Sequence, residues 1–178
     1  RGTQATSLPL SRALLAARAA AVVAIERGGA LTWHGPGQLV GYPILHLSQH
    51  REDLHWYLRT LEDALIASLE VLGIAADRVP GKTGVWTGDR KIASLGIHVK
   101  QWVTLHGFAL NVAPDLSWFD AIVPCGLHGV TMTSVARELG SDSPTLADEV
   151  RAIVVASLAT AFERRARPAA LADLVPWG

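Results

Sequence analysis

Residues 84–112 read GVWTGDRKIASLGIHVKQWVTLHGFALNV, and this stretch holds three β-prone runs, at 84–87, 92–99 and 108–112. β-Branched and aromatic residues occur in all three runs, as is typical of strands. Gly88 and Asp89 separate the first two runs, and such a pair is typical of a tight turn between strands. The stretch therefore predicts several strands of a sheet.

A long helix is predicted before this stretch, over residues 51–72. Leucines recur there at steps of three and four residues, which places them on one apolar stripe. These leucines are Leu54, Leu58, Leu61, Leu65, Leu69 and Leu72. Gly73 is placed to cap the end of this helix. Further towards the N-terminus we expect a helix over 8–20, strands over 22–25 and 31–33, and a β-prone run over 39–45.

Two more helices are predicted after the β-prone stretch. The first covers residues 134–139, with Thr133 as its N-cap and Gly140 after it. The second opens with Thr145-Leu146-Ala147-Asp148, which resembles a capping box, and runs to about residue 163. Residues 164–178 are basic and then contain proline, so we expect a loose tail.

The order of these elements predicts the fold class. Helices and strands alternate irregularly, without internal repeats or a low-complexity linker. This pattern indicates an α/β or α+β protein with a mixed β-sheet packed with helices. A chain of 178 residues has the length of one domain, so we expect residues 1–178 to form a single domain.

The composition is that of an ordinary globular domain, with 49% hydrophobic and 18% charged residues and a formal net charge of zero. A neutral chain gives no indication of nucleic-acid or anionic-membrane binding. The longest apolar run, residues 19–25, is far shorter than the ~20 residues that a membrane-spanning helix needs. No secretory signal pattern is visible, so we expect the cytoplasm, where a single reduced thiol is normal.

Cys125 is the only cysteine of the chain and lies in the run Ile122-Val123-Pro124-Cys125-Gly126-Leu127. A lone thiol excludes an internal disulfide and a cysteine-based zinc site. Free cysteines are most often small buried hydrophobes. Pro124 and Gly126 nevertheless disfavour a regular strand, and they suit a bend that presents the sulfur. Cys125 is therefore either core packing or a nucleophile.

Lysine is rare here, with three lysines, Lys82, Lys91 and Lys100, against 13 arginines. Arginine stays protonated in practice, whereas a desolvated lysine can lose its proton. Lys91 enters the apolar run KIASLG, and an ammonium beside a thiol raises the thiolate fraction. The alternative for Lys91 is a solvated turn residue after Asp89 and Arg90. Lys82 and Lys100 are interpreted as surface residues.

Residues 27–38 read RGGALTWHGPGQ and contain five glycine or proline positions beside Arg27, Thr32, Trp33 and His34. Glycines allow backbone N–H groups to approach a ligand closely, but they also build turns. No Gly-Lys-Ser/Thr sequence follows, so the segment is not a Walker phosphate-binding loop. The third glycine of a dinucleotide-binding fingerprint is missing, so the segment is not that motif either.

The seven histidines of the chain do not fall in a metal-ligand spacing, so we expect no metal and no cofactor.

Together these segments resemble the octanoyltransferase family of lipoate biosynthesis. Five pieces carry the resemblance, in the family's order: RGG..TWHGPGQLVGYP at 27–43, GVW at 84–86, KIASLG at 91–96, HGFALN at 106–111 and IVPCGL at 122–127. The pieces cover about residues 25–140. Each piece alone is a weak signal, but five pieces in the family's order make the resemblance specific.

This resemblance implies the fold of the biotin and lipoate protein ligases, a mixed β-sheet packed with helices. It also implies transfer of an octanoyl group from acyl carrier protein to a lysine of a lipoyl domain. Acceptors would be the lipoyl domains of 2-oxoacid dehydrogenases and the glycine cleavage H protein. Because the family has more chain before the region matched by Arg1, the resemblance leaves open whether its first strand and helix are missing here.

The resemblance also assigns the site. The family's thioester-forming nucleophile matches Cys125, and the lysine that lowers its pKa matches Lys91. The acyl-site segments match Arg27, Gly28, Gly29, Ala30, Leu31, Thr32, Trp33 and His34, then Ser94, Leu95 and Gly96, and then Gly107, Phe108 and Ala109. We expect Trp33 and Phe108 in the wall of an apolar tunnel.

Four alternatives remain open on the residues alone. An ATP-dependent lipoate ligase of the same fold would not need Cys125. An amidotransferase that moves octanoyl between two lipoyl domains would need it and would differ only in its donor. A non-catalytic acyl-binding protein would keep the pocket but form no adduct. A Cys/His hydrolase is disfavoured, because no Asn or Asp is placed to orient a histidine.

Overall fold

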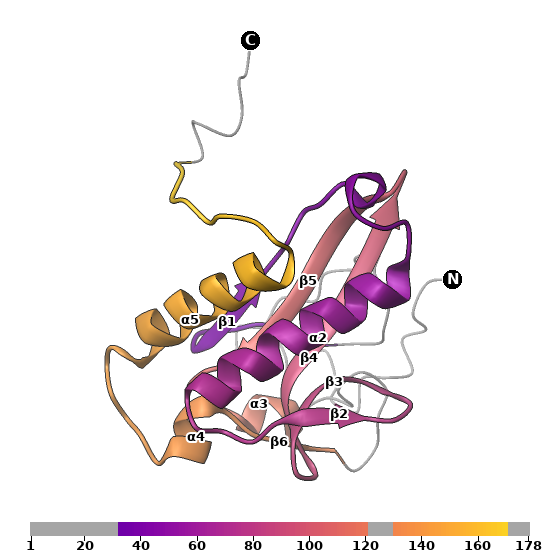
Figure 1. Cartoon of the computed structure of the whole chain (residues 1–178). Coiled ribbons are helices and arrows are strands. Elements are labelled where there is room, and N and C mark those ends of the chain that lie inside the picture. The colour runs from indigo at the N-terminus through magenta and orange to yellow at the C-terminus, as the bar shows by residue number, and fades with distance from the viewer. Residues whose placement is uncertain (1–31, 121–129, 171–178) are drawn as a thin grey trace, which may run out of the picture.

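A six-stranded sheet is the centre of the molecule in the computed structural model, which describes residues 32–120 and 130–170 (Figure 1). Five strands lie in the order β1-β5-β4-β3-β2, and β6 pairs with β4. Neighbours along the five-strand path are antiparallel, whereas β6 runs parallel to β4. The sheet is therefore mixed, which confirms the predicted fold class. The strands are β1 (Gln38–Gly41), β2 (Asp77–Val79), β3 (Lys82–Thr87), β4 (Arg90–Lys100), β5 (Val103–Asn111) and β6 (Thr131–Met132).

Two hairpins build the central strands. Thr87 pairs with Arg90, so Gly88 and Asp89 form the predicted tight turn, with Gly88 at φ +59°. Lys100 pairs with Val103, and the two residues between them, Gln101 and Trp102, both have positive φ, at 50° and 62°. A two-residue turn of this kind matches the twist of the strands that it joins. β5 therefore starts five residues before the run that the sequence predicted.

Helices α2 (Leu54–Val71) and α5 (Leu146–Ala161) lie on the same face of the sheet (Figure 1). α2 lies within the predicted range 51–72. It begins after Asp53, whose side chain accepts a hydrogen bond from the Trp56 N–H at 2.9 Å. It ends in a Schellman motif, because the Gly73 N–H bonds to the Glu70 carbonyl and the Ile74 N–H to that of Leu69. The shorter helices are η2 (Leu47–Gln49), α3 (Ser117–Asp120) and α4 (Val135–Leu139).

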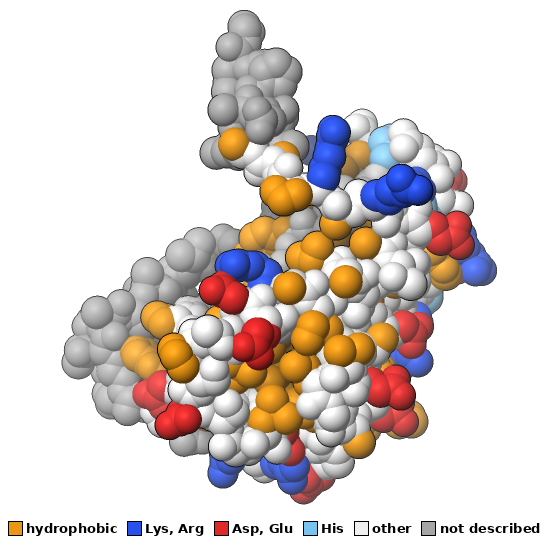
Figure 2. Space-filling view, turned by 60° about the vertical axis from the view of Figure 1, so that its left-hand side comes forward, with side chains coloured by type: hydrophobic (Ala, Val, Ile, Leu, Met, Phe, Trp, Pro, Cys, Tyr) orange, Lys and Arg blue, Asp and Glu red, His pale blue; other side chains and the backbone are white. Residues whose placement is uncertain are grey.

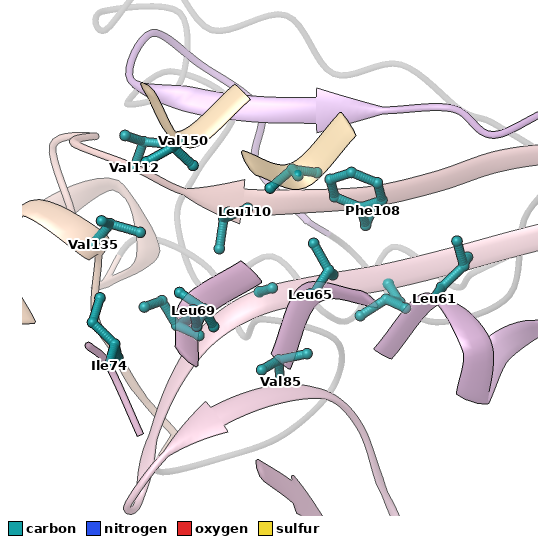
Figure 3. Close-up of a cluster of buried hydrophobic side chains, with 14 of the residues drawn as sticks. Leu61, Leu65, Leu69, Ile74, Val85, Phe108, Leu110, Val112, Val135 and Val150 are labelled. Carbon is teal, nitrogen blue, oxygen red and sulfur yellow. The ribbon is translucent and has the colours of Figure 1, made fainter. Parts of the chain in front are cut away.

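The core lies between this helical layer and the sheet. Leu61, Leu65 and Leu69 project from one side of α2 towards Phe108 and Leu110 of β5 (Figure 3). All five side chains are buried. At ~25 cal/mol per Å² of apolar surface, each fully buried leucine contributes about 2 kcal/mol. The leucine stripe of the sequence is thus the face by which α2 attaches to the sheet.

The structure corrects several local predictions. The N-cap of α4 is Ser134, which accepts from the Arg137 N–H at 3.2 Å, and not Thr133. Thr145 precedes α5 but makes no capping bond; its hydroxyl instead donates to the Glu149 carboxylate at 2.5 Å. α5 ends at Ala161, two residues before the predicted end.

At the N-terminal side, Thr32 and Trp33 lie in no strand, so the strand predicted over 31–33 is wrong where the structure describes it. The helix predicted over 8–20 and the strand over 22–25 lie outside the described residues.

Some apolar side chains remain on the surface. Figure 2 shows hydrophobic side chains grouped across the middle of one face, with charged side chains beside them. Val71 and Val155 are among the exposed large hydrophobic residues, at the end of α2 and within α5. None of the described helices is long and apolar enough to cross a membrane.

Candidate active site

A cavity lies where β4, β5 and the segment before β1 come together. Ser94 pairs with Ala109, Leu95 with Phe108 and Gly96 with Gly107, so two predicted site segments lie side by side on neighbouring strands. The cavity is lined by Thr32, His34, Tyr42, Ser94, Leu95, Gly96, His106, Gly107, Phe108 and Ala109. Eight of these residues are among the substrate-binding residues expected from the sequence. The fold thus brings together three predicted segments that are far apart in the chain.

Gly107 explains how β1 approaches the cavity. A Cβ atom at this position would lie 2.2 Å from the carbonyl oxygen of Gly41 on the neighbouring strand. Any side chain larger than hydrogen would therefore push β1 away from β5. Gly41 has a similar restriction, because its Cβ would lie 2.4 Å from the Phe108 ring. Phe108 is buried, lines the cavity and belongs to the main core, so the cavity wall is continuous with the core.

Tyr42 and His106 line the cavity but were not assigned to the site from the sequence. Their rings meet edge to face, with centroids 6.2 Å apart. His106 has a positive φ of 62°, an uncommon conformation for a non-glycine residue. Both lie within or next to segments that the sequence analysis singled out, so their neighbours were the available signal. Tyr42 is 58% exposed, which places it at the mouth of the cavity.

Trp33 does not line this cavity, although we expected it in the tunnel wall. Its ring is stacked on Trp118, with centroids 5.5 Å apart, and meets Phe119 edge to face at 5.6 Å. Trp33 packs against a second, smaller cluster that contains buried Phe119 and Met132. It therefore connects the segment before β1 to α3.

Lys91 is buried, with an exposed fraction of 1%. Its Nζ donates to the carbonyl oxygen of Thr83 at 2.7 Å and lies 5.3 Å from the centre of the Trp86 ring. The interpretation of Lys91 as a solvated turn residue is therefore wrong. Lys82 and Lys100 are exposed, as the sequence predicted. A buried ammonium needs polar partners, and the β3 backbone and an aromatic face supply them here.

The backbone of Lys91 is held from the other side by β6. Lys91 pairs with Met132, and its carbonyl oxygen accepts from the Thr133 N–H at 3.0 Å. The Glu138 carboxylate then bridges Thr133 and Arg90: it accepts from the Thr133 hydroxyl at 2.5 Å and from two Arg90 nitrogens at 2.9 and 3.1 Å. The hydrogen bonds from Arg90 are the main cause that lowers the pKa of Glu138 below its usual value.

Asn111 forms hydrogen bonds to two neighbouring segments through its side-chain amide. Its side-chain oxygen accepts from Gln38 Nε2 at 2.9 Å, and its amide donates to the Thr133 carbonyl at 3.0 Å. Asn111 is buried in an otherwise apolar stretch of β5. These bonds connect β1, β5 and the end of β6, so the strands around Lys91 and the cavity are linked by one polar network.

Two parts of the predicted site lie outside the described residues. They are Cys125 and the segment formed by Arg27, Gly28, Gly29, Ala30 and Leu31. Among the described residues, no three His, Cys, Asp or Glu side chains gather closely enough to hold a metal ion. The described part of the site therefore offers an apolar cavity with polar rim groups and a buried lysine in the adjoining sheet.

The matching family model and the similar curated sequences indicate the same family. Residues 2–159 match the family model described as the lipoyl protein ligase A/B catalytic domain. The chain is 51% identical over 138 residues to an octanoyltransferase of Nostoc sp., covering 78% of this chain and 61% of that protein. It is 52% identical over 160 residues to an octanoyltransferase of Acidothermus cellulolyticus, covering 87% of this chain and 69% of that protein. The chain thus spans roughly two thirds of the length of these relatives.

Solved structures share the fold at low sequence identity. A bipartite lipoate protein ligase from Thermoplasma acidophilum aligns with a TM-score of 0.71 at 19% identity, over 89% of this chain and 64% of that one. A lipoate-protein ligase A bound with ATP aligns with a TM-score of 0.68 at 20% identity, over 90% and 66% of the two chains. Biotin protein ligase from Aquifex aeolicus aligns with a TM-score of 0.55 at 16% identity, over 71% and 53%. At these identities the likeness concerns the fold.

Proposed function

Because the chain belongs to the lipoyl protein ligase A/B catalytic-domain family, we propose that it transfers an octanoyl group to a lysine of lipoyl domains. The relatives that are about half identical to it are octanoyltransferases. The observation that carries the proposal is the convergence of eight expected acyl-site residues on one cavity. The donor is octanoyl-acyl carrier protein. The acceptors are lipoyl domains of 2-oxoacid dehydrogenases and the glycine cleavage H protein.

The proposed reaction has two steps that share one covalent intermediate. The Cys125 thiolate attacks the thioester carbonyl of the donor, a new C–S bond forms, the bond to the carrier sulfur breaks, and the carrier thiol takes its proton from the Lys91 ammonium. The amine of the acceptor lysine then attacks the acyl-Cys125 carbonyl, the amide forms and the C–S bond to Cys125 breaks. Lys91 takes the proton of the amine, and Cys125 is released as the thiolate. Entering and leaving groups in the first step are both sulfur, so its energy is nearly balanced without ATP. Covalent catalysis divides one difficult transfer into two easier ones.

Lys91 supplies the proton chemistry in this proposal. As an ammonium near the thiol it favours the thiolate, and once neutral it accepts the proton that the attacking amine must lose. A free lysine amine has a pKa near ~10.4, so the acceptor needs such a base at neutral pH. The buried position of Lys91 supports this role, because its Nζ is fixed by the Thr83 carbonyl rather than moving in solvent.

The cavity supplies acyl binding. Leu95, Phe108 and Ala109 give it apolar wall atoms, while Gly96 and Gly107 keep the backbone open to a chain. An octanoyl tail buries about seven methylene or methyl groups at ~0.8 kcal/mol each. Apolar contact therefore suffices to hold the substrate. We assign the reaction to a single catalytic domain that works in the cytoplasm, because the proposed chemistry needs a reduced thiol.

Intact-mass analysis after incubation with octanoyl-acyl carrier protein tests the proposal. We expect one octanoyl adduct, absent in Cys125→Ser and lost again when a lipoyl domain is added. An adduct-free protein that still binds octanoate would identify a non-catalytic acyl-binding protein. Transfer from free octanoate that depends on ATP and survives Cys125→Ser would identify a ligase. Preference for an octanoylated lipoyl domain over the carrier as donor would identify an amidotransferase.

Lys91→Arg separates the two roles of the lysine. Arginine keeps the positive charge but does not give up its proton. We expect adduct formation on Cys125 to survive in part, while transfer from the adduct to a lipoyl domain falls by about a hundredfold or more, as for loss of a general base. Rapid-quench measurement of each step provides the check. Parental transfer rates in this variant would show that Lys91 does not relay the proton.

A further inference from the structure

Glu62 is a buried charged residue that the proposed chemistry does not use. It lies on α2, and its exposed fraction is 0%. One carboxylate oxygen, Oε2, accepts from Arg59 Nη1 at 2.6 Å and from Arg78 Nε at 3.1 Å. The other, Oε1, accepts from the backbone N–H of Gly84 at 3.0 Å. The Glu62 side chain is fully buried, whereas its partners Arg59 and Arg78 are 52% and 31% exposed. Burying a carboxylate is costly, and ion pairs with solvent-exposed arginines return little stability, so stability alone explains this arrangement poorly.

The Gly84 N–H belongs to the same peptide unit as the Thr83 carbonyl. That carbonyl oxygen is the acceptor for Lys91 Nζ, at 2.7 Å. One peptide plane therefore lies between the two buried charges, with its N–H towards the Glu62 carboxylate and its C=O towards the Lys91 ammonium. Because hydrogen bonds in series polarise one another, the carboxylate makes this carbonyl a stronger acceptor.

The local backbone is shaped for this contact. Gly84 has φ +133°, a conformation that side-chain-bearing residues rarely adopt, and the β3–β4 register shifts next to it, between Val85 and Trp86. A Cβ atom on Gly84 would lie 2.4 Å from Lys91 Cε and 2.9 Å from Lys91 Nζ. The unusual backbone thus gives the lysine side chain its space and directs the peptide plane at it.

We propose that Glu62 is a positioning residue for Lys91, acting through the peptide between Thr83 and Gly84. The inference rests on the proposed function, in which Lys91 is catalytic. Glu62 holds the N–H end of the peptide, Arg59 and Arg78 hold Glu62, and the carbonyl end fixes the Lys91 amine. Without the carboxylate, the peptide is free to rotate and the amine loses its fixed acceptor.

The test compares Glu62→Ala and Glu62→Gln with Asp63→Asn as the matched control. Asp63 also contacts Arg78, but it is 61% exposed. We expect Glu62→Ala to lower the rate of octanoyl transfer from the Cys125 adduct by about tenfold or more, as happens when a hydrogen bond that orients a functional group is lost. The KM for the lipoyl domain should change less than about twofold, since positioning acts on the chemical step. Glu62→Gln keeps an oxygen acceptor and should lose less, and Asp63→Asn should match the parent.

A double-mutant cycle separates positioning from a general structural effect. If Glu62 acts through Lys91, Glu62→Gln lowers transfer in the parent but causes no further loss in a Lys91→Arg background. Equal losses in both backgrounds, or parental transfer in both Glu62 variants, would overturn the inference. Glu62→Gln carries the test if Glu62→Ala does not fold, as judged by circular dichroism. A Lys91→Met variant with parental transfer would instead refute the catalytic role of Lys91 on which the inference depends, whereas a parental protein without octanoyl transfer would refute the proposed function itself.

Discussion

Among single residues, Gly84 has the most restricted position near Lys91. Its φ is +133°, and a Cβ atom added to it would lie only 2.7 Å from the Ala93 carbonyl oxygen, so an ordinary side chain is excluded. We expect Gly84→Ala to lower the free energy of unfolding by about 2–4 kcal/mol, combining backbone strain with overpacking. Displacement of Lys91 should also reduce octanoyl transfer. Urea-induced unfolding measures the first effect.

Gly88→Ala is the control for this prediction. Gly88 lies in the turn of the same hairpin at φ +59°, but no heavy atom lies within 4 Å of its ideal Cβ. Its substitution should cost only the left-handed strain of about 1–2 kcal/mol. Equal costs for both variants would show that contacts around Gly84 have no part in the effect.

The sequence identified the residues of the candidate site better than it predicted their burial and contacts. Lys91 was distinctive because lysine is rare in the chain, yet its burial depends on Gly84 and on contacts that no local pattern reveals. The cavity residues Ser94 and Gly107 were expected because the family resemblance marks them. His106 was missed because no pattern in the sequence predicts its positive φ. Cys125 stays a prediction, since it lies outside the described residues.

Among the helices and strands, long periodic patterns were reliable and boundaries were not. α2 was predicted because its leucine stripe spans five turns and ends at a glycine. β5 was predicted too short, because the turn at Gln101 and Trp102 uses residues without the usual turn signature. The N-cap of α4 was misassigned because Thr133 and Ser134 are adjacent and chemically alike. Only the backbone direction decides which hydroxyl reaches the first turn.

Two alanine substitutions test which residues cap helices α4 and α5. Ser134 is buried and accepts from the Arg137 N–H, so Ser134→Ala should lower the free energy of unfolding by about 1 kcal/mol. Thr145 makes no capping bond, so Thr145→Ala should change it by less than about 0.5 kcal/mol. Thermal or urea unfolding of the two variants gives the comparison. A larger loss for Thr145→Ala than for Ser134→Ala would restore the capping box at α5.

Across the fold as a whole, Tyr57 joins three parts of the protein. It is fully buried on α2, and its hydroxyl donates to the Pro43 carbonyl at 2.7 Å, just after β1. The Thr104 hydroxyl of β5 donates to the same carbonyl at 2.8 Å. Burial raises the pKa of Tyr57 to about 12 from its usual 10.0. The helical layer and the central hairpin therefore both donate to one carbonyl just after the edge strand β1, and the Tyr57 hydroxyl must stay protonated to do so.

This raised pKa predicts how stability falls in alkali. Below pH 10 Tyr57 is protonated in both the folded and the unfolded chain, so its contribution is fully present. Between pH 10 and pH 12 Tyr57 ionises only in the unfolded chain, and the free energy of unfolding falls by about 3 kcal/mol.

The Tyr57→Phe variant tests this prediction because it has no hydroxyl to ionise, so it should not show this fall. At pH 8 it should have a free energy of unfolding about 1 kcal/mol below that of the parent, because the hydrogen bond is missing. Urea unfolding of both proteins from pH 8 to pH 11 should show the parent's advantage shrinking as the pH rises. A constant difference between parent and Tyr57→Phe across this pH range would show that Tyr57 ionises equally in both states.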